Sequence, residues 1–300
     1  MQIMIKLNDG HIAIVAFDAG AAEQIFAWLE SGLLRTEMCK FYLKGPAEKS
    51  FKALNKNLIC QSLEDALKDA EVLLSGTGWS SSLEHDARTI AKKRGITSIA
   101  VIDHWVNYPE RFVRNDLKVL PDIIWVTDKH AYCEASKHFP GIKIIEQKNH
   151  YIQSKLDEIL SQNVHKEKNV TNVLYLLEPI RDTWASEGVP GEFQALDFFM
   201  NSIPKLGLGD KFNIILRPHP SDPKNKYDSW LNSLNVSNIH IDNKKDLASM
   251  LAWSDVVVGC ETYAMALALA ARKRVISSLP KHAHNCRLPH DKIERLNQIN

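Results

Sequence analysis

The segment WSDVVVGCETYAMALALAARKRVISS (253–278) contains a complete strand–helix–strand unit. The apolar run DVVVG (255–259) is typical of a buried strand, ETYAMALALAAR (261–272) has a helical pattern, and RVISS (274–278) is a second apolar run. Continuous apolar strands that alternate with helices are what a parallel sheet covered on both faces requires. The segment therefore predicts an α/β fold built on a parallel sheet.

The same alternation extends through most of the chain. Further strands are expected at 11–17, 40–43, 57–60, 71–75, 97–103, 122–128, 142–146, 172–178, 212–218 and 238–242. We predict two Rossmann-like parallel-sheet domains that face each other across a cleft, as in the GT-B architecture. They are an N-terminal domain (1–150) on the acceptor side and a C-terminal donor domain (171–300), joined by a helix and a polar linker (151–170).

The composition excludes several classes of protein. The 300 residues are 45% hydrophobic and 24% charged, which is close to the globular average and excludes overall disorder. The 37 basic and 36 acidic residues give a net charge of +1, so we expect no nucleic acid or anionic membrane as a partner. Without a signal-peptide pattern, a run of about 18 apolar residues or a C-x-x-C motif, we expect a cytoplasmic protein with no transmembrane segment.

The most informative residues for function follow the strand expected at 212–218, in the segment IILRPHPSD (214–222). Arg217 and His219 each precede a proline, which holds the loop extended and orients both side chains. A guanidinium matches phosphate oxygens with a planar fork of donors, and an imidazole can donate a hydrogen bond or supply a proton. We therefore expect both to bind a nucleotide phosphate, the alternative being a rigid strand exit with a solvated Arg and His.

A second candidate site follows the strand 255–259, where a helix is expected to open at Cys260-Glu261-Thr262. Gly259 ends that strand, and free N–H groups at a helix start form an anion site to which Thr262 can add a hydroxyl. Glu261 suits a ribose diol, or it only stabilises the helix N-terminus through the helix dipole. We predict that Gly259, Glu261 and Thr262 bind the nucleotide.

These two segments resemble the C-terminal half of GT-B glycosyltransferases. The most similar families are bacterial enzymes with cytidine-activated donors: sialyltransferases, capsule Kdo and polysialic acid transferases, and glycerophosphate polymerases. There a His-Pro motif contacts the donor phosphate and a Ser/Thr motif at a later helix start helps to hold it, which implies these roles for His219-Pro220 and Thr262. An acidic-acidic-Gly motif supplies their general base, and Asp18-Ala19-Gly20 resembles it in part, with Ala19 replacing the second acid.

The resemblance implies a metal-independent glycosyltransferase of polysaccharide biosynthesis. It would move a sugar, with sialic-acid-like or Kdo-like acidic sugars as first candidates, from a nucleotide-sugar donor to a glycan or protein hydroxyl. CMP is the first guess for the nucleotide, and no cofactor is expected. Asp18 and His219 are the expected catalytic residues, although Asp18 at a strand exit can instead be a helix N-cap.

Two alternatives to this function stay open. A nucleotide-sugar epimerase or hydrolase of the UDP-GlcNAc 2-epimerase type would share the fold, but its G-G-x-x-E-E-like stretch is poorly matched by Gly259–Thr262. A non-catalytic nucleotide-sugar-binding module is the other alternative, and it would be favoured if Asp18 and Asp103 both pointed away from the cleft. The sequence leaves the oligomeric state open.

Two loops of the first half supply candidates for acceptor or sugar binding. LLSGTGWSSSLEHD (73–86) lacks the lysine of a P-loop, and it is either an anion-binding turn or an ordinary strand-to-helix turn. VIDHWVNYPERF (101–112) crowds polar and aromatic groups that suit sugars, unless its own aromatics pack the loop down. The candidate residues are Gly76, Gly78, Ser80, Ser81, Asp103, His104, Asn107 and Tyr108, with Asp103–His104 as an alternative acid/base pair.

Three further expectations concern helix ends and later segments. Ser81 and Glu84 are expected to form a capping box for the following helix. Glu178 and Arg181 follow the strand 172–178 and could touch the donor. His282, His284, Cys286 and His290 in KHAHNCRLPH (281–290) match no structural zinc spacing, so we expect a solvated tail and no metal.

Overall fold

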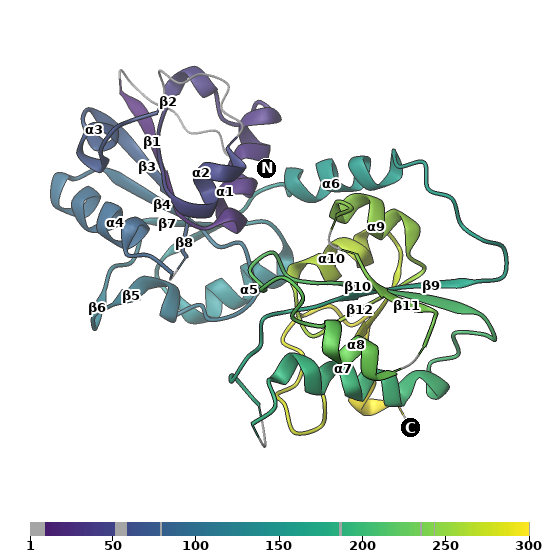
Figure 1. Ribbon diagram of the computed structural model, residues 1–300. Helices are drawn as coiled ribbons and strands as arrows, with labels where there is room; N and C mark the ends of the chain where they lie inside the picture. Colours follow the sequence, from purple (N-terminus) through teal and green to yellow (C-terminus); the bar gives the residue numbers. More distant parts are fainter. Residues whose placement is uncertain are drawn as a thin grey trace. The chain divides into compact units, whose positions relative to one another are not determined.

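A computed structural model of the chain describes residues 10–51, 59–78, 80–185, 188–234, 236–242 and 244–299. The chain forms two compact units, Met1–Ser154 and Lys155–Asn300 (Figure 1). The division falls inside helix α6 (His150–Leu160). None of the helices in the described ranges is long and apolar enough to cross a lipid bilayer.

The first unit contains a six-stranded sheet in the order β2-β1-β3-β4-β7-β8, in which all neighbouring strands are parallel. Its strands are β1 (His11–Ala16), β2 (Cys39–Leu43), β3 (Ala70–Ser75), β4 (Thr97–Val101), β7 (Ile123–Val126) and β8 (Lys143–Glu146). Its helices are α1 (Ala19–Glu30), α2 (Gly45–Ser50), α3 (Leu63–Leu67), α4 (Leu83–Arg94) and α5 (Lys129–His138), with 3-10 turns at Thr36–Met38 and Glu110–Phe112.

Both faces of the first sheet are buried, as β1 shows most clearly. Ile12, Ile14 and Ala16 pack into a core shared with α1 and α2, whereas Ala13 and Val15 pack against residues of α3 and α4. Successive side chains of a strand point to opposite faces, so a strand covered on both sides has to be apolar throughout. This two-sided burial explains the uninterrupted apolar run from Ile12 to Ala16.

The second unit contains another six-stranded parallel sheet, in the order β11-β10-β9-β12-β13-β14. Its strands are β9 (Thr171–Leu176), β10 (Phe212–Arg217), β11 (Ile239–Ile241), β12 (Val256–Gly259), β13 (Arg274–Ser277) and β14 (Ile293–Arg295). Its helices are α7 (Gly191–Ser202), α8 (Asp228–Leu234), α9 (Leu247–Trp253) and α10 (Tyr263–Ala270), with 3-10 turns at Ile203–Lys205 and Leu296–Gln298. Figure 1 shows α7 and α8 on one face of this sheet and α9 and α10 on the other.

These sheets confirm the predicted α/β fold class with two parallel sheets. In each sheet the first strand of the unit lies between the second strand and a later strand, so the direction in which strands are added reverses there. In the first unit this switch point lies between β1 and β3, and in the second it lies between β9 and β12. Ligands of such sheets bind beyond the carboxyl ends of the strands at the switch point, so these two places are the natural positions for a site.

Two short features of the sheets differ from the prediction. Of the strand expected at 57–60, residues 57 and 58 lie outside the described residues, and Ile59 makes only an isolated parallel bridge with Phe41. The antiparallel hairpin of β5 (Val113–Arg114) and β6 (Leu117–Lys118) was not predicted. Two-residue strands have too few apolar positions to leave a recognisable pattern in a sequence.

The predicted capping box at the start of α4 is wrong. The N-cap residue is Ser82, and Glu84 does not reach back to Ser81 but turns into the interior, where it is 1% exposed. A capping box needs an exposed acid at this position, and Glu84 instead has a partner inside the unit. The predicted end of the helix is confirmed, because Gly95 has a φ of 70° and forms the left-handed C-cap.

We expect the stability of the first unit to depend strongly on Trp28. It is 0% exposed, its ring meets Trp125 edge-on at 5.2 Å, and its indole N–H donates to the carbonyl of Lys148 at 2.9 Å. Trp28→Ala should lower the free energy of unfolding by about 3–5 kcal/mol, measured by urea denaturation. Leu160→Ala, at a side chain that is 77% exposed, should change it by less than about 0.5 kcal/mol. Equal losses would contradict this description of the core.

Candidate functional site

Asp18 lies at the switch point of the first unit, two residues after β1 ends. It occupies the N-cap position of α1, but its side chain makes no capping bond. Instead its Oδ1 accepts a hydrogen bond from the Ser80 hydroxyl at 2.5 Å. A Cβ atom at Gly78 would lie 1.8 Å from Oδ2 of Asp18, so any larger residue there would force the carboxylate to move. The carboxylate is therefore held by the loop after β3 rather than used as a helix cap.

Asp103 lies near the same place, after β4. Its Oδ1 pairs with Nη1 of the buried Arg111 at 2.8 Å, and the same nitrogen donates to Oγ1 of Thr77 at 3.0 Å. A Cβ atom at Gly20 would lie 1.9 Å from Oδ2 of Asp103, so this carboxylate packs against the first turn of α1. The sequence thus located both carboxylates, but not the arginine that neutralises Asp103.

Glu84 is a member of this cluster that the sequence did not indicate. Its Oε1 accepts a hydrogen bond from the backbone N–H of Phe17 at 2.8 Å. Burial raises the pKa of Glu84 to about 7; the nearby charge of Asp18 adds to the shift, while the bond from Phe17 and the charge of Arg88 act against it. A carboxyl group in the interior usually needs such partners, because desolvation disfavours its ionised form.

The other predicted residues of the first unit have mixed surroundings. Ser81 accepts a bond from the N–H of Leu83 at 3.1 Å, and Asn107 has a left-handed backbone with a φ of 59°. The ring of His104 lies 5.3 Å from that of Trp105. Tyr108 is only 2% exposed, and its ring stacks on His138, so its aromatic face packs the loop down and is not presented to a sugar.

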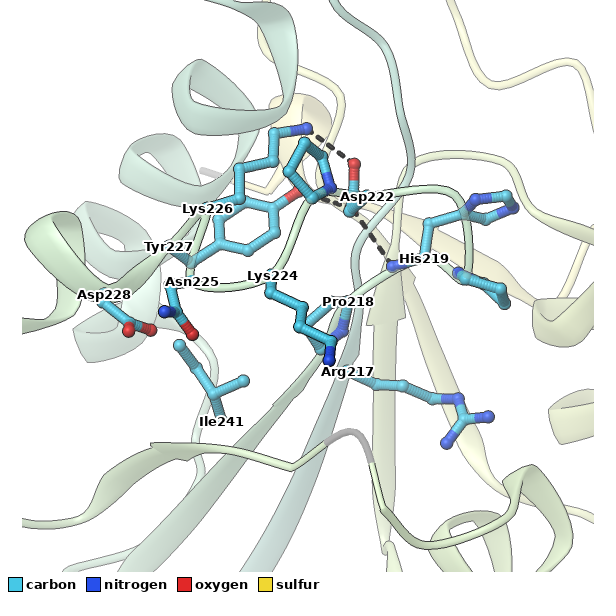
Figure 2. Close-up of a pocket in the computed structure, with 12 residues that line it drawn as sticks. Arg217, Pro218, His219, Asp222, Lys224, Asn225, Lys226, Tyr227, Asp228 and Ile241 are labelled. Atoms are coloured by element: carbon cyan, nitrogen blue, oxygen red, sulfur yellow. Dashed lines mark hydrogen bonds and ion pairs between the residues drawn. The ribbon is translucent and has the colours of Figure 1, made fainter.

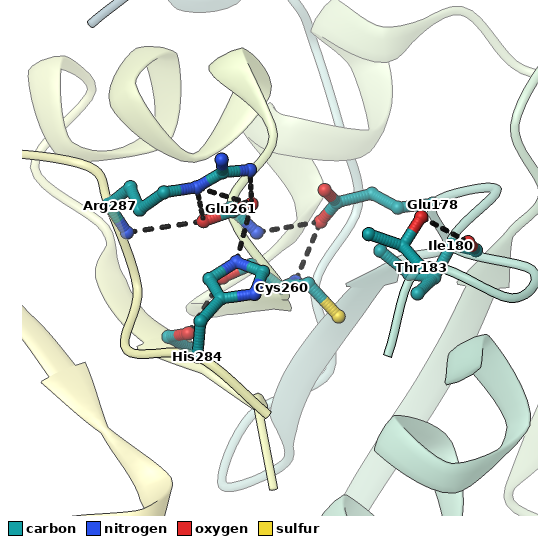
Figure 3. Close-up of polar contacts among 8 residues, drawn as sticks. Glu178, Ile180, Thr183, Cys260, Glu261, His284 and Arg287 are labelled. Atoms are coloured by element: carbon teal, nitrogen blue, oxygen red, sulfur yellow. Dashed lines mark hydrogen bonds and ion pairs between the residues drawn. The ribbon is translucent and has the colours of Figure 1, made fainter. Parts of the chain in front are cut away.

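The switch point of the second unit is filled by Glu178, two residues after β9 ends. Figure 3 shows its carboxylate aimed at the loop that follows β12. Its Oε1 accepts the backbone N–H groups of Cys260 at 2.7 Å and Glu261 at 2.9 Å. These are the groups expected to hold a phosphate. Thr262 is the N-cap of α10, and its hydroxyl makes no capping bond.

The charge state of Glu178 is set by opposing effects. Burial raises its pKa to about 7, the two N–H bonds favour the ionised form, and the neighbouring charge of Glu261 disfavours it. Gly259 lies close beside it, because a Cβ there would stand 3.4 Å from Oε1 of Glu178 and 3.1 Å from the sulfur of Met265. The chain therefore places a carboxyl group of its own at the predicted anion site.

Glu261 is held by the segment 281–290. Its carboxylate contacts Nε2 of His284 at 2.9 Å and Nη2 of Arg287 at 2.5 Å, and it also accepts the backbone N–H of Arg287 (Figure 3). Burial alone would raise the pKa of Glu261, but these bonds hold it below its ordinary value. Cys286 and Leu288 of the same segment are buried, and β14 follows it, so the predicted solvated tail is wrong. Its buried apolar residues are too few to form a recognisable pattern in the sequence.

Arg217 and His219 line a pocket of about 350 Å³ at the end of β10. Figure 2 shows both side chains pointing to the same side, away from Asn225, Asp228 and Ile241. Alternate residues of an extended segment share one side, which is why the sequence Arg-Pro-His-Pro places the two side chains on one side of the strand end. This agrees with the extended loop that the two prolines predict.

His219 is prepared as a hydrogen-bond donor. Its Nδ1 accepts the backbone N–H of Ser221 at 3.1 Å, so in the neutral ring the proton sits on Nε2. Burial lowers the pKa of His219, the charge of Asp222 acts in the opposite direction, and the charge of Arg181 lowers the pKa further. The ring is therefore neutral at pH 7 and carries an N–H that can donate.

The two arginines near His219 have partners of their own. Nη1 of Arg217 donates to the carbonyl of Lys245 at 2.7 Å and contacts the sulfur of Met250 at 3.2 Å, so Arg217 also anchors the loop after β11. Arg181 has a left-handed φ of 53°, and its backbone N–H donates to Oε2 of Glu192 at 2.6 Å. Both guanidinium groups keep further N–H donors for a ligand.

Comparison with known proteins reveals the fold. Neither the protein-family models nor the curated proteins include a match. A putative UDP-N-acetylglucosamine 2-epimerase from Listeria monocytogenes matches with a TM-score of 0.60 at 12% identity, over 89% of this chain and 79% of that one. The UDP-GlcNAc 2-epimerase from Neisseria meningitidis matches with a TM-score of 0.57 at 13% identity, over 85% and 78%.

A glycosyltransferase is similar to the same degree. The glycotransferase of kitacinnamycin has a TM-score of 0.52 at 12% identity, and the match covers 91% of this chain and 82% of that one. At such low identity these likenesses show the fold alone. The chain thus has the two-domain α/β fold of the GT-B class, which the epimerases share with glycosyltransferases.

The contact between Asp18 and Gly78 can be tested with a double-mutant cycle. Gly78→Ala should lower the free energy of unfolding by about 1–3 kcal/mol, because the added methyl group overlaps the Asp18 carboxylate. In an Asp18→Ala background most of this loss should disappear, since the overlapping oxygen is gone. Urea denaturation of the four proteins measures the coupling, and an equal loss in both backgrounds would refute the contact.

Proposed function

We propose that the chain is a glycosyltransferase that uses a nucleotide-activated sugar. The observation that supports this most is the neutral His219, whose side chain lies on the same side of the strand end as that of Arg217, at the border of the pocket that both residues line (Figure 2). A neutral donor and a guanidinium suit the phosphate of a nucleotide, because both strengthen as charge develops on the leaving group. The GT-B-class fold agrees with this use of the site.

The proposed reaction divides the work among the predicted residues. Asp18 accepts the proton of an acceptor hydroxyl while that oxygen forms a bond to the anomeric carbon of the sugar. The bond from this carbon to the donor phosphate oxygen breaks, and its electron pair leaves with the nucleotide. Arg217, His219 and Thr262 stabilise the negative charge on the phosphate, and Glu261 holds the ribose.

The proposal also names the chemical class of the donor and of the acceptor. An acidic sugar carried by CMP stays the first candidate, with a glycan or protein hydroxyl as the acceptor. The likeness to UDP-GlcNAc 2-epimerases makes epimerisation the second candidate. Transfer releases the nucleotide as the sugar passes to an acceptor or to water, whereas epimerisation changes the stereochemistry of the sugar. NMR of UDP-GlcNAc incubated with the protein separates the two.

Nucleotide binding is the first test of the donor site. Thermal denaturation with CMP, CDP, UDP, GDP, ADP or NAD should show stabilisation by one nucleotide; at 100 times its Kd this is about 2.7 kcal/mol, a few degrees in Tm. His219→Ala should abolish the shift because it removes the Nε2 donor. His165→Ala, at an exposed residue of the same unit, is the matched control and should keep it. If no nucleotide stabilises the wild type, the donor site is refuted.

Glu178 should make donor binding depend on pH. A phosphate at the start of α10 has to take the N–H groups of Cys260 and Glu261 from Glu178. Below pH 7 the carboxyl is largely protonated and competes weakly; above pH 7 it is ionised and competes strongly. The affinity for UDP-GlcNAc or CMP-sialic acid should thus fall by up to about tenfold per pH unit above 7.

Calorimetric titration at pH 6, 7 and 8 measures this dependence. Glu178→Gln keeps an oxygen for the N–H groups but loses the charge, so its affinity should not change between pH 7 and pH 8. The phosphodiester groups of these probes do not titrate there, and the lowered pKa of His219 keeps that ring neutral above pH 7. A wild-type affinity that is constant with pH would show that the phosphate binds elsewhere.

A further inference from the structure

Glu84 is a buried carboxyl of the first unit that has no role in the proposed reaction. It belongs to the first turn of α4, it is 1% exposed, and Oε1 accepts the N–H of Phe17. Its second oxygen, Oε2, is buried and has no hydrogen-bond partner among the residues that the structure describes. Leaving a buried polar atom without a partner costs stability, so its retention calls for an explanation.

The position of Glu84 ties it to Asp18. The N–H that it accepts belongs to Phe17, which directly precedes Asp18, so the bond fixes the backbone from which the Asp18 side chain starts. Glu84 also lies against the loop after β3, because a Cβ at Gly76 would stand 2.9 Å from Oε1 of Glu84. The same loop contributes Ser80, which donates to the Asp18 carboxylate. Glu84 therefore supports both sides of the Asp18 site from the interior.

Among the residues that the structure describes, two charged groups act on Glu84. Asp18 faces it from the loop between β1 and α1, and Arg88 faces it from its own helix. Arg88 is itself buried, and its Nη1 donates to the carbonyl of Gly76 at 2.9 Å and to the Ser75 hydroxyl at 3.2 Å. Arg88 therefore ties the helix that carries Glu84 to the loop after β3.

We propose that Glu84 is a positioning residue for Asp18, which fixes the Phe17–Asp18 backbone and supports the loop that holds Ser80. The inference rests on the proposed function, in which Asp18 takes the proton of the acceptor hydroxyl. A carboxylate that acts as a base has to stand within hydrogen-bond reach of that hydroxyl, so the backbone from which the Asp18 side chain starts has to be fixed.

An NMR titration of the backbone amides tests the contact in the ligand-free full-length chain. The wild-type Phe17 amide signal should show an inflection near pH 7 that reports the ionisation of Glu84, its hydrogen-bond acceptor. Glu84→Gln, which keeps an oxygen for the Phe17 N–H and removes the charge, should lose it. Asp86→Asn is the matched control on the same helix: Asp86 is exposed and bonds Ser82, so the inflection should persist. A Phe17 signal without this inflection in the wild type, or with it in Glu84→Gln, would overturn the proposal.

The rate of nucleotide release tests the consequence for the reaction. With CMP-sialic acid or UDP-GlcNAc as the probe, Glu84→Gln, which keeps an acceptor for the Phe17 N–H, should keep kcat within about twofold of the wild type. Glu84→Ala, which loses the bond, should lower kcat about tenfold with KM unchanged. A change of KM alone would count against positioning. If the wild type neither binds nor turns over a nucleotide sugar, the proposed function fails, whereas the NMR titration still decides whether Glu84 bonds Phe17.

Discussion

Helices cover both faces of each sheet, so the polar side chains that could do chemistry are confined to the ends of the strands. The β1 and β12 strands illustrate the constraint, since Ala13, Val15, Val257 and Val258 are all 0% exposed. In a parallel sheet the carboxyl ends of all strands lie at one edge. The loops at that edge therefore hold most of the candidate residues in the described ranges, with Glu84 in α4 as an exception.

The two units hold an acidic residue at the switch point in a similar way. In each unit an acidic residue stands two positions after the first strand and is held by the loop that follows the neighbouring strand. Asp18 accepts the Ser80 hydroxyl, and Glu178 accepts the N–H groups of Cys260 and Glu261. The difference lies in the hydrogen-bond donors. Asp18 accepts a single hydroxyl, which a substrate hydroxyl can replace. Glu178 accepts two N–H groups at a helix start, as a bound anion would.

Sequence reasoning was informative where the signal was local. Arg217 and His219 were singled out because a strand and two prolines lie within one short stretch, and their role in binding stays a prediction. The C-cap at Gly95 is confirmed, because a left-handed C-cap favours glycine. The reasoning failed where the partner is distant in sequence. Glu84 looked like a capping acid but bonds Phe17, 67 positions away, and Glu261 binds His284 and Arg287 from a segment that looked solvated.

The sequence by itself determined the alternation of buried strands and helices, and with it the α/β class and the edge of the sheets at which function belongs, because hydrophobic periodicity and proline geometry act within a few residues. Only the tertiary structure decided which carboxylates meet which donors. Hydrogen bonding and burial depend on neighbours in space, so the raised pKa values of Glu84 and Glu178, the neutralisation of Asp103 by Arg111 and the packing of Tyr108 became visible only in the folded chain.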